Sequence, residues 1–389
     1  GSDSIFLEES IIQSIDVLFL WSCWYGNYHG YVAMIVCSFG VLANILNIVI
    51  LTKKNMQTST NCILTGLAVS DLMTMSSYLP FAYHFYVMFP GPVTNPEKNE
   101  FGWMAFMMFN ALFTATTHTI SIWIGVVLAI FRYIYIRLAT EGYIKCSMPR
   151  AKIAVITVYL CSIIICIPNY CSLTLVEMTD RNTNRTFYML KSVNKTNEAS
   201  HMLMNINLWT YAILAKIVPC LLMCIFGGIL LFTLHLAKRK GALLHKHNRV
   251  SDSFRNRMRE HSRTTRMLVA VILLFLVTEL PQGILLVISI KKSSFFLEVY
   301  TPLGDLMDAV ALINNSINFV LYCSMSKSFR DHFIDIICCF CHYHKKQPYM
   351  LGKRSPHHAR RLESHPDDRM HNISVICRET ALLLISPTE

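Results

Sequence analysis

The feature that most constrains this chain is a series of seven long stretches that are almost free of charge. Each reaches the ~20 residues that a helix needs to cross the hydrocarbon core of a bilayer. The stretches cover residues 30–52, 55–79, 101–131, 153–176, 202–234, 267–290 and 299–326. Only 15% of the 389 residues are charged, too few for the surface of a soluble domain of this length. The sequence therefore predicts an all-α membrane protein, a seven-transmembrane helix bundle.

The spans divide the chain into four parts. We expect residues 1–29 to form an extracellular tail, 30–326 the membrane domain, 327–341 a short amphipathic eighth helix, and 342–389 a disordered cytoplasmic tail. The aromatic segment 16–25 is too short to cross a bilayer and is expected at its interface. Three cysteines end the amphipathic stretch, and we expect them to be acylated: Cys338, Cys339 and Cys341.

The basic residues indicate how the chain is oriented. Segment 238–266 contains ten Lys or Arg, whereas the first 29 residues contain acids and no Lys or Arg. The positive-inside rule then places the N-terminus outside and the C-terminus in the cytoplasm of a multi-pass protein of the plasma membrane. The sequons at Asn184 and Asn194 fall in a loop that this rule puts outside, so both are predicted glycosylation sites. Because the basic residues cluster beside spans, we expect no nucleic-acid partner.

Polar residues in the outer halves of the spans predict a ligand pocket. Asn110, Thr114 and His118 recur every four residues and therefore share one face of the third span. His118 alone is more often a packed histidine, but acids of later spans lie opposite it. The remaining candidate pocket residues are Tyr211, Glu279, Gln282, Asp305 and Asp308. An aromatic rim is expected above them, formed by Tyr78, Phe81, Tyr83, Phe85 and Tyr86.

Glu279 is the most unusual of these residues, because a carboxylate at mid-membrane costs about 2.5–3.5 kcal/mol. Three interpretations are open. Glu279 binds a cationic group of the ligand, shares a sodium ion or a proton with Asp71, or donates a hydrogen bond to Asn314 as a neutral acid.

A series of motifs along the spans resembles the rhodopsin-like G-protein-coupled receptors over about 300 residues. The motif residues are Gly40, Asn44, Asp71, Arg132, Tyr133, Pro219, Pro281, Asn314, Asn318 and Tyr322. Within that family, three stretches are similar to invertebrate myosuppressin and FMRFamide-related neuropeptide receptors and to sex-peptide receptors. They are "TISIWIGVVLAIFRYI", "MLVAVILLFLVTELPQGIL" and "NNSINFVLYCSMSKSFR".

The resemblance implies a signalling receptor rather than an enzyme, with an amidated peptide as ligand. It implies coupling to a heterotrimeric G protein of the Gi/o class, binding of arrestin and contact with membrane lipid. Arg132, Tyr133 and Tyr322 then belong to the G-protein activation machinery. A sodium ion is expected at Asp71, Ser121, Asn314 and Asn318, with a hydrogen-bonded polar core as the alternative and no other cofactor.

Several positions depart from the family pattern. Phe131 replaces the usual acid beside Arg132, and Glu260 is a candidate substitute partner for that arginine. Met107 stands where a cysteine usually begins the outer disulfide, and residues 176–204 contain no cysteine. Glu279 itself replaces the usual tryptophan. A receptor of the same class for a small non-peptide ligand therefore stays an alternative, and a transporter is a more distant one, since no paired halves with broken helices are visible.

Overall fold

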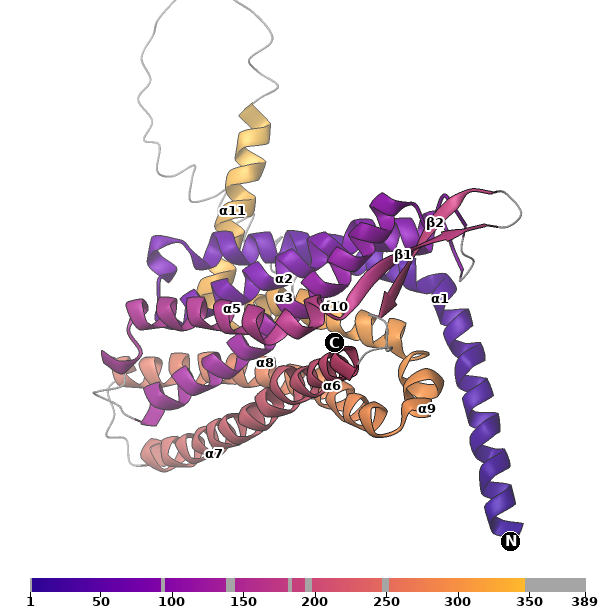
Figure 1. Cartoon of the computed structure of the whole chain (residues 1–389). Coiled ribbons are helices and arrows are strands. Elements are labelled where there is room, and N and C mark those ends of the chain that lie inside the picture. The colour runs from indigo at the N-terminus through magenta and orange to yellow at the C-terminus, as the bar shows by residue number, and fades with distance from the viewer. Residues whose placement is uncertain are drawn as a thin grey trace, which may run out of the picture. The chain divides into compact units, whose positions relative to one another are not determined.

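The charge-free stretches form long helices in the computed structural model, which describes residues 2–91, 95–137, 144–180, 184–192, 198–246 and 252–346. Seven helices in this part of the chain are long and apolar enough to cross a membrane. The prediction of a seven-helix membrane protein is confirmed. Figure 1 shows the course of the helices along the chain.

The first three spans are α1 (Ser2–Leu51), α2 (Ser59–Ala82) with its continuation η2 (Tyr83–Met88), and α3 (Phe101–Arg137). The fourth is α5 (Met148–Tyr170), and the fifth joins α6 (Glu198–Thr210), η3 (Tyr211–Ile217) and α7 (Val218–Lys246). The sixth is α8 (Asp252–Lys291) and the seventh α10 (Gly304–Met325). The shorter helices are η1 (Lys54–Met56), α9 (Ser293–Phe295), η4 (Phe296–Tyr300) and α11 (Lys327–Lys346).

The first helix begins earlier than the sequence predicts. Residues 16–25 are not a separate interfacial segment, because α1 continues through them without a break. No proline interrupts residues 2–51, and aromatic rings four residues apart support the helix. The rings of Trp21 and Tyr25, for example, stack at 5.3 Å. The candidate membrane span of this helix includes Asp16–Leu51 and so overlaps the predicted extracellular tail, whose boundary at residue 29 stays a prediction.

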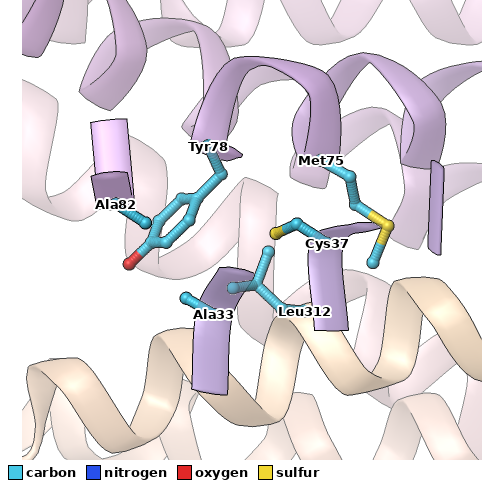
Figure 2. Close-up of a cluster of buried hydrophobic side chains, with 6 residues drawn as sticks. All are labelled: Ala33, Cys37, Met75, Tyr78, Ala82 and Leu312. Atoms are coloured by element: carbon cyan, nitrogen blue, oxygen red, sulfur yellow. The ribbon is translucent and has the colours of Figure 1, made fainter. Parts of the chain in front are cut away.

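The chain divides into two compact units, residues 1–319 and 320–389. In the first unit α3 contacts α2, α5, α7 and α8 and so occupies a central position. A buried apolar cluster joins α1, α2 and α10, as Figure 2 shows: Ala33, Cys37, Met75, Tyr78, Ala82 and Leu312. Gly30 lies so close to η2 that an added Cβ would approach the Cβ of Tyr86 to 2.5 Å. Small residues of this kind let membrane helices approach closely.

A β-hairpin lies between the fourth and fifth spans, where the sequence predicts only a loop. Strand β1 (Leu173–Thr179) pairs antiparallel with β2 (Thr186–Ser192). The backbone N–H of Tyr188 donates to the carbonyl of Asn99 at 2.9 Å, which fixes the hairpin to the residues before α3. Asn184 is exposed at the hairpin turn with φ 53°, a conformation that asparagine tolerates. Asn194 lies outside the described residues.

In the second unit, α11 covers the residues where an amphipathic helix is predicted. The Arg330 guanidinium donates to the carbonyls of Cys323 and Ser324 at 2.9 and 3.0 Å, and Tyr322 packs against Phe329. Cys338 is half-buried. The side chains of Cys339 and Cys341 lie outside the described part, so acylation stays a prediction.

Candidate functional site

Interrupted helices shape the polar interior of the first unit. Pro80 precedes η2 and Pro219 follows η3, and both segments are π-helical. A proline removes one backbone donor, and π-helical turns re-aim side chains and are frequent at functional sites. As a result η3 directs two polar side chains, Tyr211 and Lys216, toward the cavity described below.

A buried ion pair is the centre of this interior. The Lys216 Nζ atom donates to Glu279 Oε2 at 2.6 Å and to Gln282 Oε1 at 3.1 Å. The His118 Nε2 atom lies 3.0 Å from the same Glu279 Oε2. Glu279 is fully buried, and Lys216 is 4% exposed. Three helices of the bundle, α3, the η3–α7 helix and α8, therefore meet at one carboxylate oxygen.

None of the three interpretations of Glu279 that the sequence left open includes Lys216 as its partner. No described contact joins Glu279 to Asp71 or Asn314, and the protein's own ammonium group neutralises the acid. A buried carboxylate is stable in hydrocarbon only when it is paired in this way. Lys216 and Glu279 each stand out in the sequence as a charged residue within an apolar span. Their opposite charges at similar depth in the membrane were the signal that could have identified the pair.

A cavity of about 350 Å³ adjoins the ion pair, because Lys216 and His118 both line it. Six of the eight predicted pocket residues line it: Asn110, Thr114, His118, Tyr211, Gln282 and Asp308. Of the other two, Glu279 is buried behind Lys216 and His118, and Asp305 lines a neighbouring cavity of about 430 Å³. The structure therefore brings most of the predicted pocket together and adds Lys216 to it.

Asp308 is the acid that this cavity exposes. Its Oδ2 atom accepts a hydrogen bond from the Tyr78 hydroxyl at 3.1 Å, and that hydroxyl in turn lies 2.9 Å from His29 Nε2. Asp305 forms a parallel contact, accepting from the Tyr86 hydroxyl at 2.8 Å. Among the residues whose side chains the structure describes, no lysine or arginine pairs with either aspartate.

The predicted aromatic rim is largely present. The ring of Phe81 lies 5.2 Å from those of Tyr78 and Phe85 and 6.0 Å from that of Tyr86. Phe81 lines both cavities and forms part of the wall between them. Tyr83 is the exception, because it is half exposed and lines neither cavity.

A second polar cluster lies deeper in the bundle. Asp71 Oδ1 accepts from the Ser121 hydroxyl at 2.8 Å, and its Oδ2 accepts from Asn318 Nδ2 at 3.0 Å. Both side-chain atoms of Asn314 and the Oδ1 atom of Asn318 are buried without a partner in the described part of the chain. These four residues offer the hard oxygen atoms that suit a small cation.

Arg132 lies near the opposite end of α3 and is 6% exposed. It donates from Nε and Nη2 to the Thr265 hydroxyl of α8, at 3.2 and 2.6 Å. The side chain of Glu260, the predicted substitute partner, lies outside the described part, so that prediction is untested. Tyr133 packs against Phe226 at 5.6 Å. The sequence did not identify the contact with Thr265, because a threonine at a span end has no distinctive pattern.

Every cysteine whose side chain the structure describes is a free thiol. The start of α3 is held instead by an aromatic contact, in which the Trp103 ring stacks on His84 of η2 at 3.8 Å. The His84 Nε2 atom also binds the carbonyl of Lys98 at 3.0 Å. These contacts join η2 to the start of α3.

Seven membrane-spanning helices, a polar cavity among them and a buried arginine joining the third and sixth spans define a seven-helix signalling receptor. The chain belongs to the serpentine type 7TM GPCR chemoreceptor Srw family, whose model matches residues 31–340. It is 29% identical to the G-protein coupled receptor dmsr-1 of Caenorhabditis elegans, over 79% of this chain and 68% of that protein. In Drosophila melanogaster it is 25% identical to the Sex peptide receptor (79% and 72%) and 24% identical to the FMRFamide receptor (78% and 53%).

Proposed function

We propose that this G-protein-coupled receptor recognises a secreted, amidated neuropeptide of the Arg-Phe-amide type and couples to Gi/o at the plasma membrane. The observation that supports this most strongly is the exposed carboxylate of Asp308, which lines the same cavity as the Tyr78 and Phe81 rings. A guanidinium group pairs well with a carboxylate and stacks on aromatic faces. The Sex peptide receptor and the FMRFamide receptor are themselves named for peptides.

The proposed orientation places the hairpin and the two cavities outside and Arg132 at the cytoplasmic end. The charge bias of segment 238–266 supports this arrangement. A mobility shift on N-glycosidase treatment that disappears in Asn184→Gln/Asn194→Gln would test it.

Activation in this proposal is a shift between two conformations. The Arg132–Thr265 contact joins α3 to α8 and therefore stabilises the conformation in which the cytoplasmic ends of these helices are together. A peptide that binds the separated conformation better shifts the population toward it, and G protein and then arrestin bind there. A sodium ion at Asp71, Ser121, Asn314 and Asn318 would favour the resting conformation by holding the second, third and seventh spans together.

A small non-peptide ligand is the second candidate. A cavity of about 350 Å³ is at the lower end of the range for drug-sized ligands, and the family model is that of chemoreceptors. The two candidate ligands differ in whether they occupy the neighbouring cavity of about 430 Å³, since only a peptide is long enough to need both cavities.

A panel of amidated peptides applied to cells expressing the receptor separates these candidates. The readout is dissociation of the G protein, with and without pertussis toxin, which inactivates Gi/o. We expect peptides ending in Arg-Phe-amide to activate at nanomolar concentration and the toxin to abolish the response. Activation by small amines or acids but by no peptide would contradict the proposal.

A further inference from the structure

We infer that His118 and Lys216 together bind the C-terminal carboxamide of the ligand, and so discriminate an amidated peptide from one that ends in a free carboxylate or an ester. This inference rests on the proposed function and deepens it. It assigns the chemistry to two side chains at the floor of the cavity that bind one oxygen atom of Glu279.

The geometry fixes one of the hydrogen atoms that His118 carries, the one on Nε2. A carboxylate oxygen can only accept, so the His118 Nε2 atom must donate to Glu279. Lys216 already supplies the positive charge that the buried carboxylate requires. We infer that His118 is the tautomer with its hydrogen atom on Nε2 alone, whose second nitrogen, Nδ1, has a lone pair and no hydrogen atom.

That second nitrogen is available to a ligand. His118 lines the cavity and keeps 8% of its surface exposed. Its Nδ1 atom has no described hydrogen-bond partner, and it is not one of the fully buried polar atoms. The floor of the cavity thus presents one hydrogen-bond acceptor from α3.

Lys216 presents the complementary donor. An ammonium group has three hydrogen atoms, and the described contacts use two of them, on Glu279 and Gln282. Lys216 lines the same cavity. The third hydrogen atom can therefore reach a ligand oxygen that approaches from the cavity.

A primary carboxamide matches this pair group by group. Its carbonyl oxygen accepts from Lys216, and its N–H₂ group donates to His118. A carboxylate has no hydrogen atom to donate to His118. Its negative charge also gains little from Lys216, because Glu279 already neutralises that ammonium group. A site built to accept a hydrogen bond rejects an analogue without the donor strongly, because a buried polar atom is then left unpaired.

The test compares one peptide, the most potent of the amidated panel, in four forms: primary amide, N,N-dimethylamide, methyl ester and free acid. In the wild-type receptor we expect the three forms without an N–H to be at least tenfold less potent than the primary amide in G-protein dissociation. In His118→Leu the ratio of amide to ester potency should fall below threefold. His118→Gln, which keeps a donor and an acceptor, should restore the preference.

The matched control is Thr119→Val on the next position of α3, because Thr119 does not line the cavity: its hydroxyl donates to the carbonyl of Ala115 and accepts from the Cys166 thiol of α5. It should keep the wild-type ratio. An unchanged ratio in His118→Leu would overturn the inference. If His118→Leu fails to reach the cell surface, the wild-type receptor still provides a test. Equal potency of the primary amide and the dimethylamide on the wild type would also overturn the inference. If no amidated peptide activates the wild type, the proposed function falls as well.

Discussion

Removing one member of the Lys216–Glu279 pair should destabilise the receptor far more than removing both. In Glu279→Gln the Lys216 ammonium group, whose side chain is 5% exposed, keeps its charge and loses the counter-charge at 2.6 Å. Breaking a buried pair from one side typically costs about 3–5 kcal/mol, whereas replacing both partners by well-packed apolar side chains of similar volume is often neutral. The double variant Lys216→Met/Glu279→Gln should therefore lie within about 1 kcal/mol of the wild type.

The assay is the apparent melting temperature of the detergent-solubilised receptor, measured without ligand, together with surface expression. At about 2 °C for each kcal/mol in a chain of this size, we expect Glu279→Gln and Lys216→Met each to lose about 6–10 °C. Gln282→Met removes only a neutral partner of Lys216 and serves as the control, with a loss of about 2 °C. If the double variant lost the sum of the two single losses, the two side chains would not be coupled and the reasoning would fail.

Three further results are expected. Arg132→Ala should abolish G-protein activation while leaving peptide affinity within about fivefold, and Thr265→Val should raise ligand-independent activity, both measured by G-protein dissociation. His29→Ala should lower peptide potency about fivefold and His29→Gln should not, because His29 orients the Tyr78 hydroxyl that donates to Asp308. Equal potency of the two variants would show that His29 has no role in the binding site. Mild reductant should leave peptide binding unchanged, since the described cysteines are free thiols.

The sequence alone predicts the spans well, because membrane-length stretches without charge have few structural alternatives. It also predicts much of the cavity, since the four-residue spacing of Asn110, Thr114 and His118 corresponds directly to one helix face. Both results depend only on local periodicity and on charge.

The interactions that the sequence missed depend on pairing between distant segments. Which cation neutralises Glu279 depends on the π-helical turn before Pro219, which sets the direction of Lys216. Helix α1 continues through residues 16–25. The length needed to cross a membrane does not predict this extension, because residues 30–52 are already long enough to span it. The position of the hairpin involves a bond between Tyr188 and Asn99, which lie far apart in the sequence.

The most direct test of the central claim is whether Asp308 recognises the arginine of the peptide. The measurement compares a peptide ending in Arg-Phe-amide with the same peptide in which neutral citrulline replaces arginine, on the wild type and on Asp308→Asn. We predict that the wild type prefers arginine by at least thirtyfold, about 2 kcal/mol, and that Asp308→Asn responds equally to both peptides. An arginine preference that survives in Asp308→Asn at normal surface expression would contradict the account.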